Sequence, residues 1–379
     1  MVPNPARPIL ADPRLYWIGF NLVKGIGAVR FKALLDFFGD PAVAWNAPAE
    51  ALMEAGLSAK IVENLHKVRT QVNLEKIYER MLAQGIGCLT WEDESYPRHL
   101  KNIDQPPPVI YVRGELLPED DWAVAIVGTR KVTSYGRQIA EEMATFLAQN
   151  RVTVVSGLAR GVDGIAHQSA LRAGGRTIAV LGSGVDRIYP PENRRLAEEL
   201  TAHGALVSDY PPGTPPDGTN FPPRNRIISG LTLAVVVVEA GVTSGALITA
   251  TFAAEQGREV FSVPGSILAP QSKGTNRLIR DGATPLLDPQ DILEILNLTQ
   301  VTAQQTARRS LPVDPIELRL YSTLGPEPVH VDEIRAQTNL PIEQVSASLA
   351  MMELKGLVRH VGGMNYVALR EPKENYEVK

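Results

Sequence analysis

The sequence has little cysteine and no long apolar run, and both absences narrow what the protein can be. One of its 379 residues is a cysteine, Cys88, which excludes an internal disulfide and a metal cluster built from cysteines. A membrane helix needs about 20 apolar residues, whereas a run such as Leu233–Val238 suits a buried strand. The first residues, MVPNPARPIL, lack the pattern of a secretory signal. We therefore expect a cytoplasmic protein that does not enter a membrane.

The sequence also lacks the motifs of common cofactor and catalytic sites. The turn GTRKVTSYG at 128–136 does not fit GxGxxG, and no GxxxxGK[ST] segment is present, so neither a nicotinamide dinucleotide nor ATP hydrolysis is expected. Asp163 and His167 stand four residues apart, but no third ligand and no nucleophile motif accompanies them. Such an Asp is more often a helix cap, and such a His an ordinary helix residue. We expect no enzyme, no cofactor and no metal.

Charge is unevenly spread along the chain. The net charge of −4 argues against nucleic-acid binding through bulk charge. Residues 122–288, however, carry 16 Lys+Arg against 14 Asp+Glu, and 14 of the 16 are Arg. Arginine presents a planar fork of donors that suits phosphate. Composition alone leaves two explanations open, a phosphate-binding surface or a general preference for arginine.

The N-terminal residues 1–90 are expected to form a helical domain. Apolar residues recur at helical spacing, namely Leu22, Ile26, Val29, Leu34 and Leu35. The turn Lys24-Gly25-Ile26-Gly27 resembles that of a helix-hairpin-helix, in which backbone N–H groups can meet a phosphate. An ordinary tight turn that uses glycine for positive φ is the alternative. Residues 91–121 form a proline-rich connector with a short strand, and its prolines are expected to prevent helix.

Residues 122–296 alternate between apolar strands and amphipathic helices. The expected strands are Ala123–Val127, Val152–Val155, Thr177–Leu181, Ala205–Ser208, Leu233–Val238 and Glu259–Val263. Such alternation indicates a mostly parallel sheet covered by helices on both faces. The fold class is therefore α/β, with a Rossmann-like, doubly wound domain at the centre.

A smaller module is expected at the C-terminus. Residues 297–312 are polar, without periodicity, and are interpreted as a linker. Residues 313–379 contain three helical segments followed by a hairpin around Gly362-Gly363, the pattern of a winged helix. A winged helix often binds DNA through its third helix. Here that helix, 342–355, is acidic and polar, so a protein contact or a structural role suits it at least as well.

Small residues and arginines follow the strands of the central domain. In an open α/β sheet ligands bind beyond the carboxyl ends of the strands, where helix N-termini present unsatisfied N–H groups to anions. The turns concerned include Gly128-Thr129-Arg130, Ser156-Gly157, Arg160-Gly161, Gly182-Ser183-Gly184 and Ser244-Gly245. Each alone is explained by a tight turn, but together they favour a polyphosphate ligand.

The segment FPPRNR at 221–226 adds an aromatic ring to these arginines. A phosphate-binding Arg224 beside Phe221 suits single-stranded nucleic acid, because any base can stack on a ring. The alternative is that Phe221 belongs to the core and the arginines lie on the surface. Both Arg130 and Arg224 are expected to be exposed.

Taken together, these blocks resemble the DNA-processing protein A (DprA/Smf) family. Order and approximate spacing match, as does YPRHL…PPPVIYVRG upstream. The matching blocks are VAIVGTRKVTSYG, SGLARGVDGIAHQSAL, GGRTIAVLGSGVDRIYPPENRRL, DYPPGTPP, FPPRNRIISGL, VVVEAGVTSGALITA, GREVFSVPGSI and GTNRLIRDGA. Thr129 and Ala246 stand where the family often has Ser, and both keep their backbone donors.

The resemblance implies a function. Family members bind single-stranded DNA at the sheet edge, dimerise through the Rossmann-like domain, and load RecA recombinase on incoming DNA in natural transformation. It also implies a sterile-alpha-motif-like N-terminal domain. The implied DNA-binding residues are Gly128, Thr129, Arg130, Ser156, Gly157, Arg160, Gly161, Arg224, Asn225, Ser244 and Gly245, with Phe221 as a candidate base stack.

An enzyme is the main alternative. The central domain more distantly resembles nucleotide phosphoribohydrolases, whose PGGxGTxxE motif carries a Glu that serves the chemistry. Here the nearest stretch begins at Glu239, and no carboxylate follows before Glu255. An acid or base in the required place is absent, so this alternative is disfavoured. A purely structural interaction protein is a second alternative, which the Gly/Arg turns disfavour.

Overall fold

The computed structural model describes residues 12–298, 315–325, 328–354 and 357–368. It forms two compact units, Met1–Leu296 and Asn297–Lys379. Most of the expected linker, 299–312, lies outside the described residues. Among the residues that are described, no helix is both long and apolar enough to cross a membrane.

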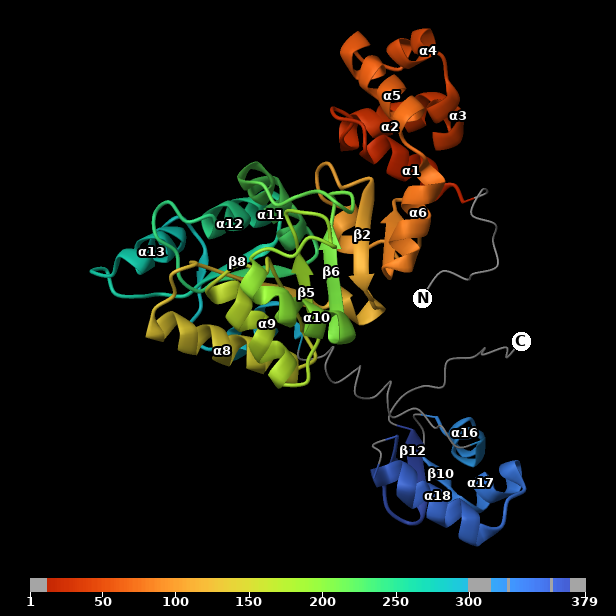
Figure 1. Cartoon of the computed structure of the whole chain (residues 1–379). Coiled ribbons are helices and arrows are strands. Elements are labelled where there is room, and N and C mark those ends of the chain that lie inside the picture. Colours follow the sequence, from red (N-terminus) through yellow and green to blue (C-terminus); the bar gives the residue numbers. More distant parts are fainter. Residues whose placement is uncertain (1–11, 299–314, 326–327, 355–356, 369–379) are drawn as a thin grey trace. The chain divides into compact units, whose positions relative to one another are not determined.

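Six helices begin the first unit (Figure 1). They are α1 Arg14–Asn21, α2 Ala28–Phe38, α3 Pro41–Asn46, α4 Ala49–Glu54, α5 Ala59–Gln71 and α6 Leu74–Ala83. Their core holds contacting aromatic rings, with Trp17 4.7 Å from Phe31 and Phe20 5.1 Å from Trp45 between centroids. Gly25, between α1 and α2, has φ of 103°, which a glycine adopts without strain. A phosphate contact at this turn stays a prediction.

The expectation of a helical domain up to residue 90 was wrong for 86–90, where burial alternates from residue to residue as in a strand, and the connector adds a second strand and one short helix. β1 Ile86–Thr90 and β2 Val109–Gly114 pair antiparallel, and α7 Arg98–Lys101 lies between them. The expectation that prolines prevent helix here was wrong for α7. Pro97 occupies its N-cap position, where a missing N–H removes no helical hydrogen bond.

The strands β1 and β2 extend a sheet of nine strands, in the order β1-β2-β6-β5-β4-β3-β7-β8-β9. All pairs from β6 to β9 are parallel, and β2 joins β6 antiparallel. The strands are β3 Ala123–Val127, β4 Thr153–Ser156, β5 Thr177–Val180, β6 Gly204–Ser208, β7 Ala234–Val237, β8 Glu259–Ser262 and β9 Thr284–Pro285. The six expected strands are confirmed, with ends shifted by no more than one residue.

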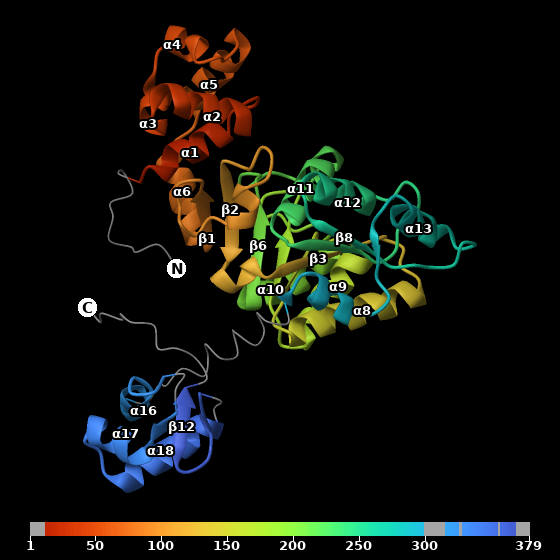
Figure 2. The ribbon, with the colours of Figure 1, turned by 180° about the vertical axis from the view of Figure 1, so that it is seen from behind.

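Helices cover both faces of this sheet. Figures 1 and 2 show α8, α9 and α10 on one face and α11 and α12 on the other. The helices are α8 Ser134–Gln149, α9 Val162–Arg172, α10 Arg194–His203, α11 Phe221–Gly230, α12 Ala246–Glu255, α13 Lys273–Arg280 and α14 Gln290–Ile295. Short 3-10 turns are η2 Pro118–Asp121, η3 Pro191–Asn193, η4 Gly218–Asn220 and η5 Pro270–Ser272. The α/β, doubly wound class is confirmed.

The second unit is a winged helix, as expected. It contains α16 Pro315–Tyr321, β10 Val329–His330, α17 Val331–Thr338, α18 Ile342–Leu354, β11 Val358–His360 and β12 Asn365–Ala368. Its three strands pair in the order β10-β12-β11. Leu320, Ile334, Val345 and Leu349 are among the apolar side chains buried in its own core.

Candidate nucleic-acid interface

The order of the strands marks where a ligand site is expected. From β3 the chain adds β4, β5 and β6 on one side, and β7 then pairs on the other side of β3. Ligands of such sheets bind at this reversal, beyond the carboxyl ends of the strands. A pocket of about 760 Å³ lies there, lined by the turns after β3 and β7 and by α11. Of the expected site residues it contains Gly128, Thr129, Arg130, Phe221, Arg224, Asn225, Ser244 and Gly245.

Glu239 holds the turns after β3 and β7 together. Its backbone carbonyl accepts a hydrogen bond from Thr129 N at 2.7 Å. Its buried carboxylate accepts from Thr133 N at 2.9 Å and from Thr133 Oγ1 at 2.5 Å. A Cβ at Gly136 would lie 2.2 Å from Glu239 Oε2, so only glycine fits there. This carboxylate organises the first turn and the start of α8.

The position of Glu239 bears on the enzyme alternative. We expect incubation with nucleoside monophosphates to release no free base, because the only carboxylate near the corresponding motif is buried and already hydrogen-bonded to Thr133. The measurement is chromatographic detection of free base over many hours. Steady release that disappears in Glu239→Gln would contradict this prediction.

Arg130 is the basic side chain of the pocket that is free to meet an anion. It is exposed, and its guanidinium carbon lies 5.7 Å from the centroid of the Phe221 ring. Among the described residues, no carboxylate forms an ion pair with it. An arginine over an aromatic face keeps its outer N–H groups available, which suits a phosphate.

The second turn, after β4, contributes Ala159 and Asp163 to the pocket wall, whereas the expected site residues Ser156 and Gly157 do not line it. Ser156 is fully buried, and its Oγ donates to the Ile126 carbonyl at 2.6 Å. Gly157 N donates to the Asp163 carboxylate at 3.1 Å. Asp163 therefore caps this turn, while Gly161 is the N-cap residue of α9. Ser156, Gly157 and Gly161 therefore shape the loop behind the pocket, and Asp163 both caps this loop and lines the pocket.

Arg160 and Gly161 also lie outside the pocket wall. A Cβ on Gly161 would lie 2.3 Å from the Thr129 carbonyl oxygen, so the glycine lets the second turn pack against the first. Arg160 is exposed and forms an ion pair with Glu192. This hydrogen bond and charge lower the pKa of Glu192 and raise that of Arg160.

Arg224 is buried, which corrects the expectation that it is exposed. Its side chain is 4% exposed, and Nη1 donates to the Val180 carbonyl at 2.7 Å. Burial lowers its pKa to about 10, opposed by the charge of Asp163. A Cβ on Gly157 would lie 1.9 Å from Arg224 Nη1. Because α11 starts at Phe221, Arg224 lies within the first turn of this helix and reaches the sheet edge. There the Val180 carbonyl accepts its hydrogen bond, and the charge of Asp163 offsets its buried positive charge.

The aromatic ring at the start of α11 is half-buried. Guanidinium carbons of Arg130 and Arg224 lie over Phe221 at 5.7 and 5.8 Å from its centroid. Tyr189 lies beside it, 5.7 Å between centroids. Tyr189 also lines the pocket, and sequence reasoning did not single it out. Its position two residues before η3, in a loop rich in proline, carried no recognisable binding motif.

The turn after β7 is tied to α11. Asn225 Nδ2 donates to the Gly245 carbonyl at 3.2 Å, and Ser244 Oγ accepts from Ala246 N at 3.4 Å. Gly245 is the exposed N-cap of α12. Helix N-termini attract anions, so this turn presents the start of α12 to the pocket that also contains Arg130.

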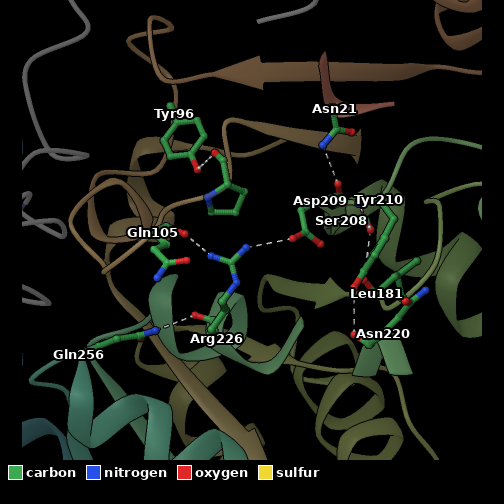
Figure 3. Close-up of polar contacts among 11 residues, drawn as sticks. Asn21, Tyr96, Gln105, Leu181, Ser208, Asp209, Tyr210, Asn220, Arg226 and Gln256 are labelled. Carbon is green, nitrogen blue, oxygen red and sulfur yellow. Dashed lines mark hydrogen bonds and ion pairs between the residues drawn. The ribbon is translucent and has the colours of Figure 1, made fainter. Parts of the chain in front are cut away.

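The far side of α11 is held by a polar cluster (Figure 3). Arg226 donates to Asp209 at 3.2 Å and to the Gln105 carbonyl of the connector. The Asp209 carbonyl accepts from Asn21 Nδ2 of α1 at 3.4 Å. Gln256 of α12 donates to the Arg226 carbonyl at 3.0 Å. One arginine thus connects α11, the connector and the end of β6 next to α1.

His167 does not pair with Asp163. Its Nδ1 lies 2.6 Å from Thr177 Oγ1, and because that hydroxyl donates to the Val154 carbonyl, Nδ1 carries the hydrogen. The ring is fully buried, and burial, assisted by Arg224, lowers its pKa to about 3. His167 is therefore a neutral residue that links α9 to β5.

This histidine makes stability depend on pH. An unfolded histidine titrates near pH 6.5, so between about pH 6.5 and about pH 3 only the unfolded chain takes up this proton. The free energy of unfolding should fall as the pH is lowered through that window. Urea unfolding at several pH values should show a weaker dependence for His167→Gln than for the natural chain. Equal dependence in the two proteins would contradict the prediction.

The fold and the pocket define a Rossmann-like protein with an arginine-lined crevice at the carboxyl edge of its sheet and a winged-helix module. Residues 87–297 match the family of DNA recombination-mediator protein A, and residues 288–364 match the DprA winged helix domain. The chain belongs to the DNA recombination-mediator protein A (DprA/Smf) family, whose members act in DNA processing.

Relatives and solved structures agree with this assignment. Protein Smf of Synechocystis is 38% identical over 388 residues, 93% of this chain and 98% of its own. DNA processing protein DprA of Bacillus subtilis is 40% identical over 261 residues, which cover 66% of this chain and 88% of that protein. The structure of DprA from Streptococcus pneumoniae superposes with a TM-score of 0.64 at 32% identity, covering 74% of this chain and 97% of that one. The structure of DprA from Helicobacter pylori, described for its single-stranded DNA binding mode, superposes with a TM-score of 0.51 at 31% identity. The match covers 56% of this chain and 95% of that one.

Proposed function

We propose that this chain binds single-stranded DNA in the pocket between the turns after β3 and β7. The observation that carries the proposal is Arg130, exposed and without an ion-pair partner among the described residues, in the same pocket as the N-terminus of α12. Backbone N–H groups of Gly128 and Gly245 contact phosphates together with Arg130, while the N–H groups of Thr129 and Ser244 donate to the Glu239 and Gly241 carbonyls and hold the two turns. Ser156, Gly157, Gly161 and Arg224 support these contacts from behind, and Arg160 adds a contact outside the pocket.

The single-strand preference follows from the aromatic rings beside the arginines. Bases of a duplex are stacked and paired, whereas the bases of a single strand are free to stack on Phe221 or on the neighbouring ring of Tyr189. The test is a gel-shift series comparing an oligonucleotide with a duplex of the same length. Preference for the single strand is expected, and equal or tighter binding of the duplex would reject the proposal.

We infer that the bound strand is delivered to RecA recombinase during natural transformation. Membership of the family of DNA recombination mediators supports this role. Adding the chain to RecA and a single strand should speed the assembly of RecA filaments. The rate of ATP hydrolysis by RecA measures this assembly. No acceleration at any ratio of the two proteins would reject this step while leaving DNA binding intact.

We also propose a homodimer formed through the Rossmann-like domain. Ile267, Leu268 and Leu287 are 80, 85 and 77% exposed, and apolar groups left in solvent often mark an interface. Sedimentation should give twice the mass of one chain, and Leu268→Glu should shift it toward the monomer. A natural chain that sediments as a monomer at high concentration would exclude the dimer.

The winged helix is expected to be dispensable for binding the strand. Its α18 carries Glu343 and Glu353 but no basic side chain within Ile342–Leu354, and phosphate binding needs positive charge. A chain truncated after Leu296 should keep its affinity for single strands to within roughly tenfold, about 1.4 kcal/mol. Fluorescence anisotropy of a labelled oligonucleotide measures this, and a larger loss would assign the module to the DNA site.

A further inference from the structure

We propose that Tyr189 is the residue on which a base of the bound strand stacks, with Phe221 as its support. The inference rests on the proposed single-strand binding and goes beyond it, because it assigns the base contact to a residue that no motif marked. Tyr189 lies in the loop between β5 and η3 and lines the pocket. Its ring is half-buried and lies at 34° to that of Phe221, with 5.7 Å between centroids.

Phe221 is already surrounded by protein groups. The guanidinium groups of Arg130 and Arg224 lie over its ring. The backbone of Gly182 packs so closely that a Cβ there would lie 2.8 Å from Phe221 Cδ1. A base could take the face of Phe221 only by displacing an arginine that the phosphates need. Phe221 is therefore better suited to orient Arg130 than to receive a base.

Tyr189, in contrast, has few neighbours of this kind. In the part of the chain that the structure describes, Phe221 is the one ring in contact with it, no guanidinium lies over it, and its hydroxyl makes no hydrogen bond. Its ring therefore lines the pocket without a guanidinium over its face.

The loop that carries Tyr189 is held in place on both sides. Before it, Ser183 Oγ donates to the Arg187 carbonyl at 2.6 Å. After it, Asn193 Nδ2 donates to the Leu158 carbonyl at 2.9 Å, which fixes η3 to the turn after β4. A ring held in this way loses little conformational freedom when a base stacks on it. Any base offers a π face, so the contact adds affinity without sequence preference.

The test compares variants of the full-length chain on two oligonucleotides of equal length, one natural and one with abasic sites throughout. Tyr189→Ala and Tyr189→Leu should each bind the natural strand roughly tenfold or more weakly, the effect of losing one base–aromatic stack. Tyr189→Phe should bind as the natural chain does. The slope of log affinity against log salt should not change, because no phosphate contact is lost. Tyr135→Ala, which removes an exposed tyrosine of α8 outside the pocket, is the matched control.

The abasic strand separates stacking from a structural role. On it, Tyr189→Ala should bind as well as the natural chain, because there is no base to lose. An equal loss on both strands, or a loss in Tyr189→Phe as large as in Tyr189→Ala, would overturn the proposal. If Arg130→Ala weakens binding while Tyr189→Ala and Tyr189→Leu do not, this inference fails and the proposed function stands. If the natural chain binds no single strand, the proposed function fails first.

Discussion

Replacing Arg224 with alanine should destabilise the first unit by about 1–3 kcal/mol, the usual cost of leaving a buried hydrogen-bonding group without its partner. Asp163 would remain buried without its compensating charge, and the Val180 carbonyl would lose its donor. Burial already raises the pKa of Asp163, and Arg224 is the first influence that opposes it. Urea unfolding followed by circular dichroism measures the loss.

The matched control is Arg280→Ala on α13. That arginine has a side chain 75% exposed and an exposed pair with Asp281, so its removal should cost under about 1 kcal/mol. Arg224→Lys should recover only part of the stability, because lysine lacks the planar guanidinium that donates to the Val180 carbonyl. Unchanged stability in Arg224→Ala, with weaker DNA binding and a flatter salt dependence, would show instead that Arg224 binds a phosphate.

Replacing Arg130 with alanine should have the opposite profile, a large loss of DNA affinity at constant stability. One charge-assisted contact contributes about 1.5–3 kcal/mol, so affinity for single strands should fall roughly tenfold or more. The slope of log affinity against log salt should decrease in magnitude by about 0.7, the value for one phosphate on a single strand. Because phosphates carry no sequence information, the loss should be equal for different sequences.

Arg130→Lys should restore part of this affinity, since the charge returns without the bidentate fork. Fluorescence anisotropy at several salt concentrations, beside a melting curve, measures both quantities. Arg280→Ala again serves as the control and should leave the salt slope unchanged. A lower melting temperature of Arg130→Ala with the natural slope would mean that Arg130 is a structural residue.

The strands and the sheet edge that carries the pocket follow from local pattern. Apolar runs such as Ala123–Val127 alternate with amphipathic helices, and only a covered parallel sheet buries both. The carboxyl edge is then the place for small residues, and the structure brings the turns after β3 and β7 to one pocket. Local spacing was sufficient for these features because each depends on residues close in sequence.

The burial of Arg224 and the position of Tyr189 depend on contacts between distant segments. An arginine after two prolines has the composition of a surface segment, and only the docking of α11 onto β5 places it beside Asp163 and Val180. Tyr189 comes next to Phe221 across 32 residues of sequence. Glu239 is similar, because its partner Thr133 precedes it by 106 residues. Periodicity and motif spacing contain no information on such pairs.

The apolar core shared by the N-terminal helices and the sheet determines how the protein comes apart. Leu34 and Leu65 of the helices belong to the same buried cluster as Leu181 and Leu206 beside the sheet. Detaching the helices would expose both sets to water, so the first unit should unfold in a single cooperative transition, with no stable intermediate that keeps the sheet alone. Cutting the chain between α6 and β2 should therefore lower the resistance of the sheet to urea, because Leu181 and Leu206 would lose the apolar side chains that cover them.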